Sequence, residues 1–283
     1  GESHPPTNPV EPNSGTWSLT YLKRDFRGNF YSPHGRKLFF PIKDPKEINW
    51  NEELKVVQKT LRNTTKLTRD IAVYYGTGVP TKQWTPVIDR LIDTYGVSPT
   101  RAARILAAVH GAINDTMVVV WHLKFKWDTA RPNQLDRKMK TVICTPRFPA
   151  YPSGHATMSG CAETVLSYFF PGEKEKLREL GDINALSRLY GGIHFPADNN
   201  EGLKLGRYIG GVIVEHLKRQ RSRDLQPIDR PYQDNLDADF DPIDYKQFIP
   251  YDFPNNCTSL VIDDKGEKST ENALENKPKL FFY

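Results

Sequence analysis

The chain contains little cysteine and no long apolar run. Its three cysteines, Cys144, Cys161 and Cys257, are too few and too scattered among 283 residues for a disulfide framework or a zinc site. We therefore expect free buried thiols with at most one disulfide, which leaves the redox compartment open. Apolar runs such as residues 117–121 are far shorter than the roughly 18 residues that cross a membrane, so we expect no membrane span.

A strong net charge of either sign is also missing from the chain. Lys and Arg number 39 against 34 Asp and Glu, a surplus that is too small and too evenly spread to indicate a nucleic-acid surface. One basic run stands out, but it closes a helical pattern, where cations complement the helix C-terminus. This run consists of Lys218, Arg219, Arg221 and Arg223. We expect it to be a solvated helix end, and we expect no nucleic-acid partner.

The first residues contain no charged segment followed by an apolar one, so no signal peptide is visible. The sequence GESHPP fits a mature end that remains after such a peptide is removed, which predicts a secreted or extracytoplasmic protein. A trimmed chain would begin in the same way, so localisation stays open. The sequence also leaves the oligomeric state open, with a homodimer among the alternatives.

Apolar periodicity predicts an all-α helical bundle that forms one structural domain. Residues 1–50 read as an irregular arm rich in proline, glycine and asparagine, residues 51–223 as the helical core, and residues 224–283 as a second arm with an apolar patch at 260–262. The strand signal is poor throughout. We expect helices over about 52–75, 84–95, 98–127, 153–171, 173–190 and 198–217.

The first chemical motif lies at the end of the predicted helix 98–127, in the stretch KFKWDTARP. Lys124 falls on the buried stripe of that helix, seven residues after Met117, and therefore needs a partner. Arg131 precedes Pro132, which biases it away from helical geometry. The two cations could converge on one point, although such a pair alone is more often found on a surface.

Two further motifs carry histidines. Ser153, Gly154 and His155 open a predicted helix, whose free N–H groups favour an anion and whose glycine permits close approach, although an ordinary N-cap has the same residues. In SRLYGGIHFPAD, Asp198 follows His194 by four residues, a spacing at which a carboxylate can hold one imidazole nitrogen. Arg188 lies in the same stretch and adds a planar fork of donors suited to an oxyanion.

In this order, the three motifs resemble the superfamily that unites vanadium-dependent haloperoxidases, soluble bacterial acid phosphatases and type 2 phosphatidic acid phosphatases. The likeness covers about residues 98–217 and implies an all-helical core. It implies that His194 coordinates the vanadium of vanadate or attacks phosphorus, that Asp198 orients His194, and that His155 is the acid-base residue. The oxyanion would be held by Lys124, Arg131, Ser153, Gly154 and Arg188.

The resemblance leaves two reactions open. Trp121 and Phe148 match positions that line the halide pocket in chloroperoxidase-type members, although plain core aromatics are as common there. This favours a haloperoxidase that uses vanadate, hydrogen peroxide and a halide. The compact intervals, 22 residues from Arg131 to Ser153 and 33 from His155 to Arg188, look more like the acid phosphatases, which need no cofactor. A phosphatase would cleave a phosphate ester through a phosphohistidine at His194, and a non-catalytic oxyanion-binding protein is the third alternative.

Overall fold

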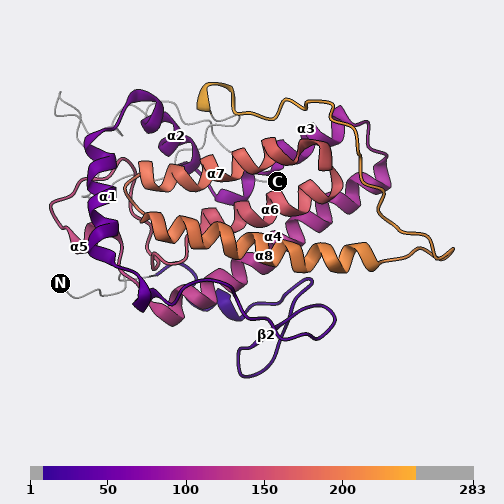
Figure 1. Cartoon of the computed structure of the whole chain (residues 1–283), viewed down its shortest axis with the longest axis horizontal. Helices are drawn as coiled ribbons and strands as arrows, with labels where there is room; N and C mark the ends of the chain where they lie inside the picture. Colours follow the sequence, from indigo (N-terminus) through magenta and orange to yellow (C-terminus); the bar gives the residue numbers. More distant parts are fainter. Residues whose placement is uncertain (1–8, 247–283) are drawn as a thin grey trace, which may run out of the picture.

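A computed structural model describes residues 9–246 of the chain and shows a bundle of long helices with irregular segments wrapped around it (Figure 1). The expected all-α architecture is confirmed. The α-helices are α1 (Trp50–Arg62), α2 (Lys66–Gly76), α3 (Thr85–Thr94), α4 (Pro99–Trp127), α5 (Pro132–Leu135), α6 (Gly154–Phe169), α7 (Lys174–Tyr190) and α8 (Pro196–Arg219). Short 3-10 turns η1 (Ser14–Thr16), η2 (Pro45–Glu47), η3 (Pro80–Gln83), η4 (Pro171–Glu173) and η5 (Ile243–Tyr245) connect or flank them.

The central helices form the core because each presents an apolar face to its neighbours. α6 has buried residues along nearly its whole length and packs against α4, α7 and α8 (Figure 1). The approach of α8 to α6 is close, since a Cβ atom at Gly206 would lie 1.9 Å from the Thr157 carbonyl oxygen and one at Gly160 would lie 2.5 Å from that of Leu203. Glycine is therefore required at both positions for this packing.

One expected helix is wrong. The apolar repeat over 52–75 predicts a single helix, but α1 ends at Arg62 and α2 begins at Lys66. Thr65 is in extended geometry, and its side chain caps α2 together with that of Thr68 in a reciprocal capping box. The side-chain bonds of these threonines compete with helix continuation, which lets α2 turn and lie against α7.

The N-terminal arm is held to the bundle by a buried carboxylate. Asp115 of α4 accepts hydrogen bonds from the backbone N–H groups of Thr20, Tyr21 and Leu22 at 2.6 to 2.8 Å. The arm also forms a small antiparallel hairpin, in which β1 (Lys23–Arg24) pairs with β2 (Phe30–Tyr31). Lys23 lies opposite Tyr31 in this hairpin, which the sequence does not predict.

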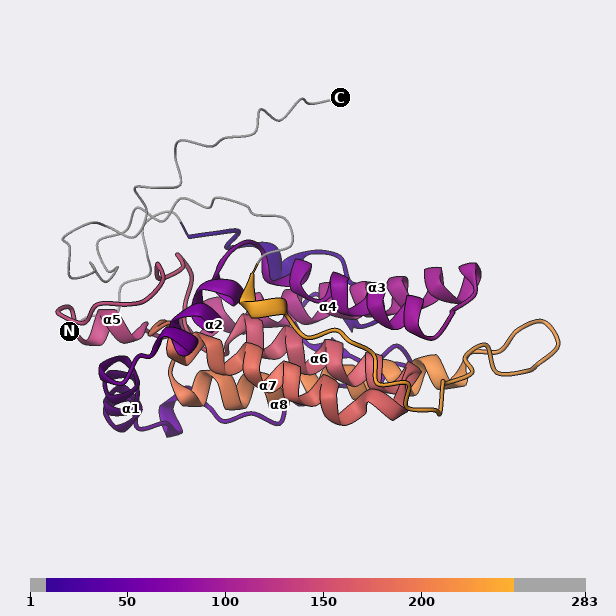
Figure 2. The ribbon, with the colours of Figure 1, turned by 90° about the horizontal axis from the view of Figure 1, so that it is seen from above.

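After α8 the chain runs back along the bundle toward α2 (Figure 2). Aromatic residues attach the described part of this arm, because Tyr232 stacks on Phe170 at 5.3 Å between ring centroids. The basic run lies at the end of α8, as expected, with Lys218 and Arg219 in the last turn. The apolar patch at 260–262 lies outside the described residues. Cys161 is a free buried thiol, and Cys144 is disulfide-bonded.

By length and mean hydropathy, the stretch Pro99–Leu135 meets the criterion for a membrane-spanning helix. In the fold, 56% of its most apolar window is buried against the rest of the protein. This is weak evidence for a membrane span, since the core helix of a soluble protein satisfies the same criterion.

Candidate active site

The structure brings the residues of all three motifs together at one end of the bundle. α4 and α7 end there, while α6 and α8 begin there, so two helix C-termini meet two helix N-termini. Lys124 and Arg188 lie in the last turns of α4 and α7, where the helix dipole favours a cation. The antiparallel arrangement of four helices therefore assembles a site from segments up to 74 residues apart, as the distance in sequence from Lys124 to Asp198 shows.

Lys124 and Arg131 are buried against backbone oxygens. Lys124 is fully buried, and its Nζ donates to the carbonyls of Pro149 and Ala150, at 2.7 Å each. Arg131 is in extended geometry, as expected before a proline, and its guanidinium donates to the carbonyls of Phe148 and Ile193 at 3.0 and 2.8 Å. Neither cation has a carboxylate partner in an ion pair among the described residues.

Arg188 is the third buried cation. Its Nε donates to the Ser187 hydroxyl at 3.0 Å, and one terminal nitrogen donates to the Ala72 carbonyl at 3.1 Å. The Ser187 hydroxyl in turn donates to the carbonyl of Asn184 one turn earlier. The guanidinium is therefore held in place by neutral groups that leave its charge uncompensated.

His194 and Asp198 form a buried pair with defined geometry. The His194 Nδ1 lies 2.8 Å from the Asp198 Oδ2, which also accepts the backbone N–H of Phe195 at 2.9 Å. Because the carboxylate accepts, Nδ1 carries the proton and Nε2 presents its lone pair. That Nε2 lies 2.9 Å from a terminal nitrogen of Arg131. An imidazole in this tautomer is suited to coordinate a metal centre or to act as a nucleophile.

His155 is the site residue nearest to solvent. It is half-buried, whereas Ser153, Gly154, Arg188 and His194 are buried. Its Nε2 lies 2.9 Å from the Tyr75 carbonyl of α2, and because a carbonyl only accepts, Nε2 carries a proton and Nδ1 is free to exchange one. This position suits a residue that passes protons between a bound ligand and solvent.

The electrostatics of the site favour a bound anion. The candidate site contains three buried cations and one buried carboxylate, that of Asp198. Burial lowers the pKa of Lys124 well below its usual range, with the charge of Arg131 adding to the effect, and it lowers the pKa of Arg131 to about 10 and that of Arg188 to about 9. Burial likewise depresses the pKa of His194, where Arg131 contributes next. A negative ligand would relieve all of these penalties at once.

The start of α6 fits a tetrahedral oxyanion. Ser153 caps the helix by accepting the Ala156 N–H at 3.4 Å, and among residues 9–246 the N–H groups of Gly154 and His155 donate to no protein acceptor. A Cβ at Gly154 would lie 3.7 Å from Trp121 and 3.9 Å from Lys124, which is ordinary contact. Packing alone thus does not require glycine here. The free donors and the unfilled approach fit phosphate or vanadate.

An aromatic pair borders the cations. The rings of Trp121 and Phe148 lie 4.8 Å apart, and Phe148 is 5.3 Å from the Lys124 Nζ and 5.0 Å from the Arg131 Cζ. The Trp121 N–H donates to the carbonyl of Val10 at 3.1 Å, so the N-terminal arm covers this side of the site. Both aromatic residues named from the sequence thus lie against the candidate oxyanion site.

Sequence reasoning missed the groups that orient the site. The carbonyls of Ala72, Tyr75, Pro149, Ala150 and Ile193 hold the cations and His155, but a backbone oxygen has no residue-type signature. α2 in particular carries no chemical motif, yet two of its carbonyls contact Arg188 and His155. No pattern in the sequence could have identified them.

Part of the chain matches the model of a known protein family. Residues 103–222 match the family model described as the PAP2 superfamily. No curated protein sequence matches the chain.

Among solved structures, the chain resembles a bacterial vanadium-dependent iodoperoxidase, with 22% identity and a TM-score of 0.61 over 75% of this chain and 60% of that one. It also resembles a bacterial vanadium-dependent chloroperoxidase in its apo form, with 14% identity and a TM-score of 0.57 over 74% of this chain and 56% of that one. This chain therefore spans less than two thirds of either structure. At these identities the likeness concerns the fold. The match to the PAP2 superfamily model covers the part of the helical core that carries the site.

Proposed function

We propose that this chain is a vanadate-dependent haloperoxidase, which uses hydrogen peroxide to oxidise a halide at the oxyanion site. The observation that carries the proposal is the packing of Phe148 against Lys124 and Arg131, with Trp121 packed on the Phe148 ring. An apolar wall beside a cluster of cations suits a large, weakly hydrated halide, because the anion keeps an electrostatic attraction while it leaves water. Hydrolysis of a phosphate monoester has no need of such a wall.

The residues present would hold vanadate in the following way. The Nε2 of His194 would coordinate it, because Asp198 keeps the proton on Nδ1. Lys124, Arg131 and Arg188 would neutralise its charge, and the N–H groups of Gly154 and His155 would donate to its oxygens. Bound vanadate supplies the electrophilic centre that activates hydrogen peroxide. These contacts require Arg131 to release the His194 Nε2, which it contacts at 2.9 Å.

His155 would manage the protons of the reaction. Its Nε2 is fixed by the Tyr75 carbonyl, so the free Nδ1 is the atom that gains or loses a proton. Burial and the charge of Arg188 hold the pKa of His155 well below its usual value, which favours the neutral imidazole. A neutral imidazole can accept a proton from hydrogen peroxide.

The test is a pair of assays on the purified full chain. After loading with vanadate, the protein should halogenate a trapping dye in the presence of bromide or iodide and hydrogen peroxide, and His194→Ala should abolish this turnover. Phe148→Ala should raise the KM for halide while phosphate binding is retained. Phe39→Ala serves as the matched control, because Phe39 is 74% exposed and lies on the N-terminal arm. Release of phosphate from p-nitrophenyl phosphate without vanadate-dependent halogenation would overturn the proposal.

The second candidate is an acid phosphatase, and the position of His155 favours it. A partly exposed imidazole at the edge of an oxyanion site is well placed to protonate a leaving alcohol. In that reaction the His194 Nε2 attacks phosphorus, the ester oxygen leaves with a proton from His155, and water then releases phosphate from His194. A non-catalytic oxyanion-binding protein is less well supported, since binding alone does not need a histidine tied to a carboxylate.

A further inference from the structure

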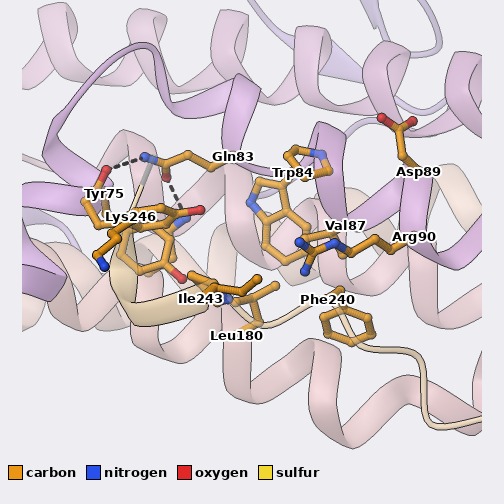
Figure 3. A pocket seen from close by; sticks show the side chains of 14 residues that line it. Tyr75, Gln83, Trp84, Val87, Asp89, Arg90, Leu180, Phe240, Ile243 and Lys246 are labelled. Carbon is orange, nitrogen blue, oxygen red and sulfur yellow. Dashed lines mark hydrogen bonds between the residues drawn. The ribbon is translucent and has the colours of Figure 1, made fainter. Parts of the chain in front are cut away.

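A cavity lies beside the candidate active site and has its own lining. It encloses about 470 Å³ and is bounded by α2, by η3 and α3, by α7 and by the C-terminal arm from Phe240 to Lys246 (Figure 3). That volume is within the range of small-molecule sites. None of the residues assigned above to the oxyanion site lines it.

Four aromatic residues contribute to the walls. Tyr74, Tyr75, Trp84 and Phe240 all contribute to the lining, with Leu180 and other aliphatic side chains between them (Figure 3). Trp84 is buried, and its N–H donates to the Ser159 hydroxyl at 3.2 Å. The indole therefore offers only its ring to the cavity. Such walls favour a flat aromatic ligand.

Two buried polar atoms in the lining have no partner in the part of the chain that the structure describes. They are the Tyr75 hydroxyl and the Asn184 Oδ1, on side chains that are 2% and 1% exposed. The Asn184 amide is oriented by a chain of hydrogen bonds, because its Nδ2 donates to the Gln83 Oε1 at 3.4 Å and the Gln83 Nε2 donates to the Tyr74 carbonyl at 3.2 Å. An oriented, unpaired acceptor in a buried position calls for a ligand donor.

Of the charged groups around this cavity, Arg90 is bonded to the chain, while Asp89 and Lys246 are exposed. The Arg90 guanidinium donates to the carbonyls of Asp239 and Asp241, at 3.2 Å each, and Lys246 lies 3.7 Å from Asp244. Asp89 also borders the cavity and adds a negative charge. With both signs present and the cations engaged, the lining favours a neutral ligand over an anion.

We propose that this cavity binds a neutral aromatic molecule with one hydrogen-bond donor, of the indole or phenol class. The rings would stack the ligand, and the Asn184 Oδ1 would accept its donor. Binding of this molecule does not depend on either of the two enzymatic activities proposed above.

The cavity is also connected to the oxyanion site. The Tyr75 carbonyl holds His155 at 2.9 Å, and the Asn184 carbonyl accepts the Ser187 hydroxyl, which in turn accepts Arg188. A ligand on Tyr75 and Asn184 would therefore be linked to His155 through Tyr75 alone and to Arg188 through Asn184 and Ser187. This places an aromatic molecule next to the site of the chemistry without occupying the oxyanion position.

Indole and benzofuran are matched probes, because they share size and shape and differ in the N–H that benzofuran lacks. By isothermal titration calorimetry on the full chain, indole should bind about 5- to 10-fold more tightly, which is the effect of one hydrogen bond to a buried acceptor. Asn184→Leu should abolish this difference while benzofuran still binds. Equal affinities in the unmodified protein, or no binding of either probe, would overturn the proposal.

Two tryptophan substitutions locate the binding. Ile243 borders the cavity and is 69% exposed, so Ile243→Trp should obstruct it and weaken indole binding at least about 10-fold without perturbing the core. Leu236→Trp is the control, since Leu236 is 50% exposed on the same arm and does not line the cavity. Both variants should keep the phosphate-induced rise in melting temperature that reports the oxyanion site. Equal indole binding by the two variants would refute the location, whatever the outcome at the oxyanion site.

Discussion

Phosphate and vanadate should stabilise this protein against heat, and the effect should depend on the buried cations. Lys124 and Arg131 interact with the carboxylate of Asp198, while Arg188 is repelled by Arg131, so an anion that binds the folded state removes like-charge repulsion that the unfolded chain does not have. At 100 times its dissociation constant, a ligand of the folded state contributes about 2.7 kcal/mol. For a domain of this size, that corresponds to a rise of roughly 5–10 °C in Tm.

The assay is differential scanning fluorimetry across a series of phosphate and vanadate concentrations, with chloride at equal ionic strength as the control. Arg188→Gln should reduce the shift strongly, because it removes one buried charge and its fork of donors. The shift should also be larger at pH 6 than at pH 9. Burial lowers the pKa of Lys124 and of His155, and a bound anion raises both again, so binding takes up protons and weakens as the pH rises.

A Tm that does not respond to phosphate or vanadate would refute the reasoning, because three uncompensated buried cations could not then form an anion site. An equal shift in the Arg188→Gln variant would mean that the anion binds elsewhere. An equal shift with chloride would show a general salt effect.

Three further outcomes follow from individual contacts. Asp198→Asn should lower turnover about 10- to 100-fold while the fold persists, because it disturbs the tautomer of His194. Steady-state kinetics measure the turnover and circular dichroism checks the fold. An unchanged kcat would contradict the prediction. Asp115→Ala should lower the free energy of unfolding by about 3–5 kcal/mol, since three backbone N–H groups lose their acceptor. It should also expose the N-terminal arm to protease. Urea unfolding measures the loss of stability. Burial raises the pKa of Glu163 to about 7 despite its hydrogen bond to Arg207, so the folded state binds a proton that the unfolded chain has lost. The free energy of unfolding should therefore fall as pH rises from about 4.5 to 7. Glu163→Gln should flatten this pH profile, and an unchanged slope in the variant would be inconsistent with the reasoning.

The boundaries of the core helices could be predicted from the sequence because they depend on local patterns. Ser98 and Pro99 predict the start of α4, and the apolar repeat carries it to Trp127, where the structure ends it. The repeat over 52–75 gave a wrong prediction of one continuous helix, because apolar periodicity shows which face of a helix is buried and does not detect a break of three residues. The break depends on Thr65 and Thr68, whose side chains bond each other's backbone in a capping box.

The sequence by itself determined the types of chemical group and their order along the chain, because the charge of Lys124, Arg131 and Arg188 and the ionisable rings of His155 and His194 belong to the residues. Only the tertiary structure decided how these groups are held. The atoms that orient them are backbone carbonyls on other segments, which every residue type carries alike. The cavity beside the active site likewise arises where α2, α3, α7 and the C-terminal arm meet, and its unpaired acceptor exists only because packing removed Asn184 from water.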